Sequence, residues 1–66
     1  MNKHIVEGKW EQFKAAVKKK YAKLTDDELL EVKANSQKLS GYLQAKYGLA
    51  KDEAEKEAKD FKEKFQ

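Results

Sequence analysis

Apolar side chains recur at every third or fourth position in the first third of the chain, and this spacing constrains the fold most strongly. Between residues 3 and 24 the series is Val6, Trp10, Phe13, Val17, Tyr21 and Leu24. Side chains with this spacing lie on one stripe of an α-helix, while the charged residues between them point toward water. The sequence therefore predicts an amphipathic first helix whose stripe enters a hydrophobic core.

The composition extends the helical prediction to the rest of the chain. Ala, Leu, Lys, Glu and Gln favour helices, there is no Pro, and the only glycines are Gly8, Gly41 and Gly48. Sixty-six residues suffice for one small domain, so residues 1–66 are expected to form a single all-α unit. Because there is no Cys, neither disulfides nor thiolate metal sites are available to stabilise it.

The stretch KKKYAKLTDDELL, residues 18–30, reverses charge within a few positions. Thr25 and Glu28 match a capping box, in which each side chain satisfies a backbone amide of the other residue. Acidic residues then suit the positive first turn of a new helix, and the lysines suit the negative last turn of the previous one. We therefore interpret the charge reversal as a junction between two helices and not as a ligand site.

A second junction is predicted in the stretch QAKYGLAKDEAE, residues 44–55. Gly48 suits a left-handed helix end, and Asp52 and Glu53 suit a new first turn. When Tyr21 is aligned with Tyr47, the two junctions form a weak repeat, for which duplication and coincidence both remain open. The last helix is expected at about residues 51–65, with an inner stripe of Ala54, Ala58, Phe61 and Phe65 in which the phenylalanines provide the docking surface.

Residues 25–47 fit two descriptions. One long helix would carry Leu29, Val32, Ser36, Leu39 and Leu43 on a single stripe, with a polar Ser36 inside it. Alternatively, Asn35 and Ser36 end one helix and cap the next, because both side chains bond to nearby backbone outside helices. We favour a break near residues 34–36, which gives a small bundle of four short helices arranged as two α-hairpins.

Residue patterns typical of enzymes and of metal sites are missing from the sequence. His4 is the single histidine and has no Cys or zinc-site spacing around it, so we expect a surface residue. Ser36 and Ser40 have no plausible base, and there is no glycine-rich phosphate loop. We predict no catalytic, cofactor-binding or metal-binding residues, no cofactor and no enzymatic activity.

A lysine-rich segment offers the one candidate contact surface, namely Lys14, Lys18, Lys19, Lys20 and Lys23. Together with Trp10 and Tyr21 it could neutralise and stack on single-stranded nucleic acid. The alternative, which we favour, is that both aromatics lie in the core and the lysines are solvated. The net charge is only +3 and Arg is absent, so any nucleic-acid contact is expected to be weak and electrostatic.

The same helix could instead lie on a membrane surface, but a small domain needs its apolar stripe for the core. No apolar run approaches the length of about 20 residues that a membrane span needs, and no secretory signal is visible at the N-terminus. We therefore expect a cytoplasmic protein that does not span a membrane.

Four segments in order, GKWEQFK (8–14), KLTDDEL (23–29), SGYLQAKYG (40–48) and AEKEAKDF (54–61), resemble the CsbD-like family. Its members are small bacterial proteins associated with the general stress response, and the resemblance covers about residues 2–61. It implies two α-hairpins packed across one another, similar to the arrangement of a SAM domain. The family's biochemical activity is not established, so the resemblance supplies no catalytic or ligand residues.

The leading functional hypothesis is a non-enzymatic stress-response protein that acts as a soluble protectant or a weak interaction module. Its hydrated, charge-balanced surface favours solubility at high copy number. The alternative is a module that binds nucleic acid or an anionic surface through the lysines of the first helix. A partner-binding adaptor is a third hypothesis, based on fold analogy alone. Partners are otherwise unknown, no specific small molecule is predicted, and a monomer is expected.

Overall fold

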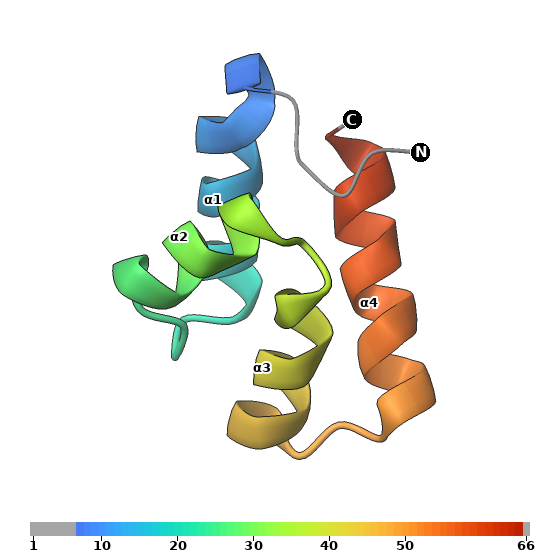
Figure 1. Cartoon of the computed structure of the whole chain (residues 1–66). Helices are drawn as coiled ribbons and strands as arrows, with labels where there is room; N and C mark the ends of the chain where they lie inside the picture. Colours follow the sequence, from blue (N-terminus) through green and yellow to red (C-terminus); the bar gives the residue numbers. More distant parts are fainter. Residues whose placement is uncertain (1–6, 66) are drawn as a thin grey trace.

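The computed structural model describes residues 7–65, which form a short 3₁₀ helix and four α-helices and contain no strand (Figure 1). The elements are η1 (Glu7–Lys9), α1 (Trp10–Lys20), α2 (Asp26–Ala34), α3 (Lys38–Tyr47) and α4 (Lys51–Lys64). This confirms the prediction of an all-α bundle of four short helices over the described range.

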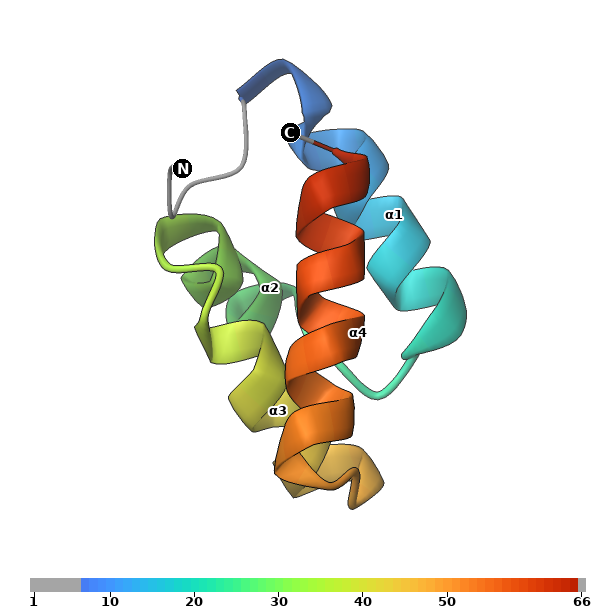
Figure 2. The same cartoon turned by 90° about the vertical axis from the view of Figure 1, so that its right-hand side faces the viewer.

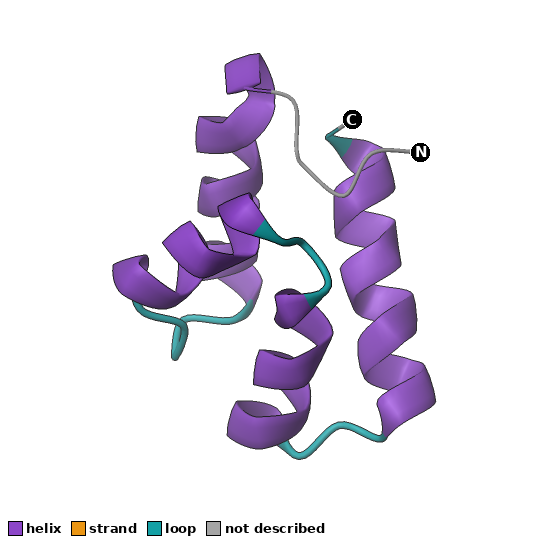
Figure 3. Ribbon diagram, viewed as in Figure 1, coloured by secondary structure: helices purple, strands orange, loops and turns teal. Residues whose placement is uncertain are grey.

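The helices form an open bundle in which α4 has neighbours on two sides. α3 and α4 are joined by a short loop, run in opposite directions and make the most extensive helix contact (Figures 1 and 3). α4 also packs against α1, and Figure 2 shows it in front, between α1 and α3. α2 packs mainly on α3 and runs obliquely to the other helices. The second predicted hairpin is thus clear, whereas α1 and α2 do not lie side by side along their lengths.

The core is built from the predicted stripes. Its buried side chains are Trp10, Phe13, Val17, Tyr21 and Leu24 from the first third, Leu29 and Val32 from α2, Leu39 and Leu43 from α3, and Ala54 from α4. α1 ends earlier than the stripe, because the backbone of Tyr21 is no longer helical, at φ −125° and ψ 71°. The turn after α1 nevertheless keeps Leu24 inside. Val6 and His4 lie outside the described residues.

α4 docks through its phenylalanines, as predicted. The ring of Phe13 meets those of Phe61 and Phe65 edge-on, with centroids 6.4 and 6.0 Å apart. Both rings of α4 are partly buried against the core, and Ala54 is the one fully buried residue of this helix. Because burial of an aromatic side chain stabilises far more than burial of an alanine, these two rings hold the last helix in place.

The junction at residues 18–30 is a helix boundary with the predicted capping box. The Glu28 amide donates to Oγ1 of Thr25 at 3.2 Å, and the Thr25 amide donates to Oε1 of Glu28 at 2.9 Å. Asp26, Asp27 and Glu28 occupy the first turn of α2. Both clusters of charge therefore sit at helix ends, where the helix dipoles favour them.

The break near residues 34–36 is also confirmed. α2 ends at Ala34, and Asn35 is extended at φ −149° and ψ 100°. The Asn35 side-chain oxygen accepts from the Gln37 amide at 3.1 Å, and Ser36 is buried. The expectation that Asn35 or Ser36 caps the next helix is wrong, because Gln37 is the N-cap of α3 and makes no side-chain capping bond. The Asn35 side chain instead stabilises the turn before that helix.

Gly48 ends α3 in the left-handed conformation, at φ 66° and ψ 22°, as predicted for a glycine at a helix end. Its amide donates to the Gln44 carbonyl at 3.0 Å. The chain then enters α4, whose first turn carries Asp52 and Glu53. Of the apolar residues not assigned to a stripe, Leu30 is 61 % exposed, while Tyr42 and Leu49 pack partly against the core.

Candidate functional site

The five candidate lysines do not form one continuous face. Four lie on α1, and Lys23 lies in the turn that follows it. Consecutive helical residues differ by about 100° in direction, so Lys18, Lys19 and Lys20 point to three sides of α1. The structure therefore divides the predicted surface into a part facing α2, a part facing α4 and the turn.

Lys18 faces α2 and forms an ion pair with the carboxylate of Asp26. The pKa of Asp26 is lowered, chiefly by this hydrogen bond and further by the charges of Lys18 and Lys14. Both partners are substantially exposed. The pair thus links the end of α1 to the start of α2 next to the capping box. Lys18, one of the five candidate lysines, therefore already has a carboxylate partner.

Lys23 is held against the end of α3. Its amide donates to the Tyr47 hydroxyl at 2.9 Å, and its carbonyl accepts from Nζ of Lys46 at 3.2 Å. The Lys23 ammonium lies 5.2 Å from the centroid of the Tyr47 ring, a cation–π arrangement. Two consecutive residues of α3 therefore fix the backbone of the turn between α1 and α2.

The two aromatic residues beside the lysines, Trp10 and Tyr21, are core residues. Trp10 is 6 % exposed and stacks on Phe13 with centroids 5.7 Å apart. Tyr21 is 7 % exposed and meets Tyr47 edge-on at 5.0 Å. Neither ring offers a face to a base, so the favoured core interpretation is confirmed. Only the lysine charges remain as a means of contacting nucleic acid.

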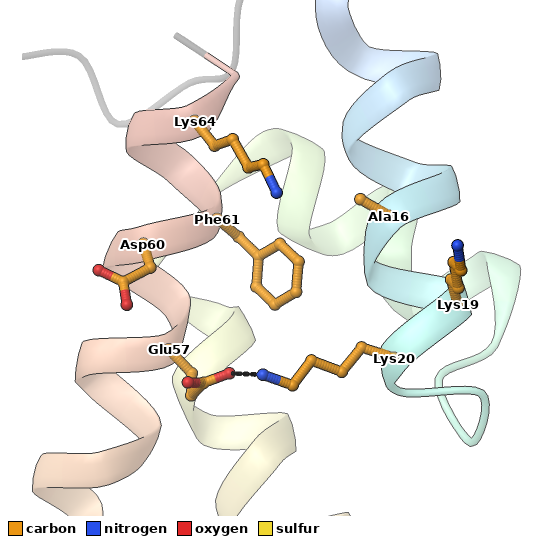
Figure 4. Close-up of a pocket in the computed structure, with 7 residues that line it drawn as sticks. All are labelled: Ala16, Lys19, Lys20, Glu57, Asp60, Phe61 and Lys64. Carbon is orange, nitrogen blue, oxygen red and sulfur yellow. Dashed lines mark hydrogen bonds and ion pairs between the residues drawn. The ribbon is translucent and has the colours of Figure 1, made fainter.

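A groove between α1 and α4 has a volume of about 650 Å³. Its lining residues are Ala16, Lys19 and Lys20 from α1 and Glu57, Asp60, Phe61 and Lys64 from α4. Figure 4 shows the Phe61 ring in the gap, with Ala16 opposite and Lys64 reaching in from one end. We call this hollow the α1–α4 groove. Two of the five predicted lysines, Lys19 and Lys20, belong to it.

Glu57 closes one end of the α1–α4 groove with two hydrogen bonds to the same oxygen. Oε1 accepts from Nζ of Lys20 at 2.7 Å and from the Tyr21 hydroxyl at 2.8 Å. Burial, followed by this hydrogen bond and the charge of Glu57, raises the pKa of Tyr21 to about 12. The pKa of Glu57 is lowered, first by Lys20 and then by Tyr21. This clamp ties the end of α1 to the middle of α4.

Two carboxylates of α2, Glu28 and Glu31, are held in the same manner by residues of α3. Glu28 pairs with Lys46 at 2.7 Å, and that hydrogen bond is the main cause of its lowered pKa. Glu31 accepts from Nζ of Lys38 at 3.1 Å and from the Tyr42 hydroxyl at 2.9 Å, and its pKa is also lowered. The shifted carboxyls are thus biased toward the ionised form.

Residues 7–65 place no three His, Cys, Asp or Glu side chains where they would hold a metal ion. The hydroxyl of Ser40 donates to the Gln37 carbonyl at 3.1 Å, a bond within the start of α3. Within the same range, none of the helices has the length and apolar character that a membrane crossing demands.

Sequence reasoning did not identify Glu57, Phe61 and Lys64 as site residues. Their spacing along α4 does show a helix face with charges beside an aromatic ring. No sequence pattern, however, places that face opposite Lys20 and Ala16. The groove exists only because two helices at opposite ends of the chain lie next to each other.

Comparison with known proteins agrees with the family resemblance found in the sequence. The model of the CsbD-like family matches residues 4–56. The chain is 47 % identical over 64 residues to the UPF0337 protein pc0632 of Protochlamydia amoebophila, covering 97 % of each chain. It is 44 % identical over 61 residues to the UPF0337 protein YjbJ of Escherichia coli (strain K12), covering 92 % of this chain and 88 % of that protein.

A third relative is the UPF0337 protein PA4738 of Pseudomonas aeruginosa, which is 38 % identical over 65 residues and matched along its whole length. No solved structure matches the chain. The SAM-domain-like arrangement implied by the resemblance therefore stays a prediction.

Proposed function

Because the chain belongs to the CsbD-like family of bacterial stress-response proteins, we propose that it is a non-enzymatic protectant or weak interaction module. In this proposal residues 1–66 act as a single domain, as a monomer in the cytoplasm. The relatives match over nearly their whole length, which supports treating the chain as one unit.

The observation that carries the proposal is that many surface charges form ion pairs between helices. Ion pairs connect α1 with α2, α1 with α4, and α3 with α2, namely Lys18–Asp26, Lys20–Glu57, Lys46–Glu28 and Lys38–Glu31. They keep the surface charged, mixed in sign and strongly hydrated, in agreement with a mean hydropathy of −1.04. Such a surface favours dispersion at high concentration and weak, non-specific contact with other proteins.

The pKa directions support a non-enzymatic role. A carboxyl that serves as a general acid at neutral pH needs a raised pKa. The pKa values of Asp26, Glu28, Glu31 and Glu57 are all lowered, in each case chiefly by a lysine partner. Ionised carboxylates that are paired with lysines in this way suit a role in connecting helices, which supports the non-enzymatic proposal.

The proposal is tested by drying or heating a labile enzyme with and without the protein and measuring the enzyme activity that remains. We expect more activity than with an equal mass of an inert globular protein. Leu43→Asp places a charge at a fully buried position and should unfold the chain, so this variant should protect less. Equal protection by the inert protein would refute the protectant role.

We propose, as a second candidate, weak binding of nucleic acid or another anionic surface by Lys14, Lys18, Lys19, Lys20 and Lys23. It is supported by Lys14 and Lys19, which make no ion pair within residues 7–65. Lys18 and Lys20 already have carboxylate partners, so binding would have to compete with those pairs. The contact would be electrostatic, without base recognition.

This candidate is tested by titrating labelled single- and double-stranded DNA at about 50 mM and about 200 mM salt. Changing Lys14, Lys19 and Lys23 to Gln should weaken binding and reduce its salt dependence. The matched control changes Lys51, Lys56 and Lys59 of α4 to Gln, which removes the same charge from another surface. Binding that is absent at micromolar protein, or equally weakened by both triple variants, would exclude the lysines of α1.

A further inference from the structure

The floor of the α1–α4 groove includes an aromatic ring that the core buries only in part. Phe61 is only partly buried, and its ring contacts Phe13 and Tyr21 edge-on, with centroids 6.4 and 6.1 Å apart. The residue across from it on α1 is Ala16, which is too small to cover the ring (Figure 4). A larger side chain at this position would fill the groove from within.

The groove is preformed at one end. Lys20 and Tyr21 both donate to Glu57, so the ends of the two helices are held at a fixed separation by three side chains. The charges of Lys20 and Glu57 are largely satisfied by each other. A ligand therefore meets a slot that is already formed, with the Phe61 ring on its floor, and no closing motion of the helices is required to form it.

The free charges around the slot are mostly positive. The side chains of Lys19 and Lys64 make no ion pair or hydrogen bond within residues 7–65. Asp60 is the remaining carboxylate of the lining, and Figure 4 shows it directed away from the Phe61 ring. An anion at the mouth of the groove is thus attracted by two ammonium groups, one from each helix.

We propose that the α1–α4 groove binds a small amphipathic anion, a molecule with one apolar chain or ring and one carboxylate-like head. The apolar part lies on Phe61 and Ala16, the head lies near Lys64, which Figure 4 shows reaching toward the ring, and Lys19 adds positive charge from the α1 side. The volume of about 650 Å³ lies in the range of small-molecule sites, and the lining combines the apolar Phe61 and Ala16 with charged side chains that would orient the head. The sequence patterns predicted no small-molecule ligand, and this site does not depend on the function proposed above.

The probe for the test is octanoate, compared with octanol, which lacks the charge, and with acetate, which lacks the chain. Binding is followed by changes in backbone amide NMR signals of the full chain. We expect octanoate to shift the signals of Ala16, Phe61 and Lys64 with a dissociation constant on the order of 1 mM. Acetate should shift none of them at the same concentration, and octanol should bind more weakly.

The decisive variant is Ala16→Leu, which fills the groove without removing a core residue. Losing the burial of about two methylene groups of the probe should weaken binding about tenfold. The matched control is Ala15→Leu, at the neighbouring exposed position of α1. Because Leu and Ala both favour helices, the two variants should remain folded, and their far-UV circular dichroism verifies this.

The role of charge is tested by changing Lys19 and Lys64 together to Gln, with Lys51 and Lys56 as the matched pair. The groove variant should bind octanoate about threefold more weakly, as expected for exposed ion pairs, and the control should not change. The proposal is overturned if octanoate at about 10 mM shifts no groove signals, or if the two leucine variants bind alike. Equal binding of octanol and octanoate would also overturn it.

Discussion

The hydroxyl of Tyr21 lies 2.8 Å from Oε1 of Glu57, the same oxygen that Nζ of Lys20 reaches at 2.7 Å. Tyr21 also meets the rings of Tyr47 and Phe61 edge-on, so its side chain touches both α3 and α4. A single residue just past the end of α1 thus connects three helices. The stability of the bundle and the shape of the α1–α4 groove both depend on this contact.

Tyr21→Phe keeps the ring and removes the hydrogen bond to Glu57. We expect the free energy of unfolding to fall by about 1 kcal/mol, the usual net contribution of a hydrogen bond, because this bond to a carboxylate is only partly buried. Urea unfolding measures the change. Tyr42→Phe is the control, because Tyr42 also donates to a carboxylate, Glu31, but at a more exposed site. A Tyr21→Phe protein as stable as the wild type would contradict this role.

The same contact predicts a loss of stability in alkali. The folded chain holds the Tyr21 proton up to a pKa of about 12, above the ordinary value of 10.0. The resulting stabilisation is complete below pH 10 and is lost as the pH rises from about 10 to about 12. In an ultraviolet titration, Tyr21 should be the last of the three tyrosines to ionise. Tyr21→Phe should remove that step.

Glu57→Gln should reduce the acid sensitivity of the fold. The pKa of Glu57 in the folded state lies below its ordinary value of 4.5, so its stabilisation is present above that pH and lost as the pH falls through the folded pKa. At pH 7 the variant should lose at most about 1 kcal/mol, because the ion pair with Lys20 is partly exposed. The difference from wild type should shrink as the pH falls below 4.5 and through the lowered pKa of the folded state.

The control for this prediction is Glu55→Gln, an exposed carboxylate of the same helix. Because its side chain makes no ion pair within residues 7–65, this substitution should change the free energy of unfolding by less than about 0.5 kcal/mol at neutral pH. Stability measured by urea unfolding at several pH values decides between the outcomes. A Glu57→Gln difference that stays constant from acid to neutral pH would mean that the carboxylate charge is not the cause.

Thr25→Ala should destabilise the fold through the capping box. The variant loses the bond to the Glu28 amide and leaves that donor without its side-chain partner. The expected cost is about 1 kcal/mol, and Thr25→Ser should retain most of the stability because it keeps the hydroxyl. Thermal unfolding of the three proteins provides the measurement. If both substitutions cost the same, the methyl group and not the cap would be responsible.

Two glycines should respond in opposite directions to replacement by alanine. Gly48 has φ 66°, where a Cβ is strained, so Gly48→Ala should cost about 1–2 kcal/mol. Gly41 lies inside α3, where an added methyl group would meet open space, and Gly41→Ala should stabilise by about 0.5–1 kcal/mol. Urea unfolding of the pair checks both signs. Changes of the same sign would contradict the assigned backbone roles.

Local features of this protein were predictable because each depends on neighbours in sequence. The capping box of Thr25 and Glu28, the helix end at Gly48 and the break after Ala34 were all identified from residue type and spacing. The inner stripes were predicted for the same reason, since helical periodicity selects which side chains face one way. The buried positions of Trp10 and Tyr21 followed from that stripe.

The candidate site was less predictable. The lysines near the end of α1 were recognised as a charged segment, but their partners lie on α2 and α4. Lys20 and Glu57 are far apart in the chain, and many other lysine–glutamate pairings would satisfy the same composition. The same is true of Lys46, whose bonds to Glu28 and to the Lys23 carbonyl fix the turn between α1 and α2.

The sequence by itself determined the junctions between helices and which helix faces are apolar, because hydrogen bonds and side-chain spacing within a helix act over a few residues. Only the tertiary structure decided which helices became neighbours. That choice depends on how the rings of Phe13, Phe61 and Phe65 fill the core together, which is a property of the whole packed chain. The clamp at Glu57 and the α1–α4 groove are consequences of that packing.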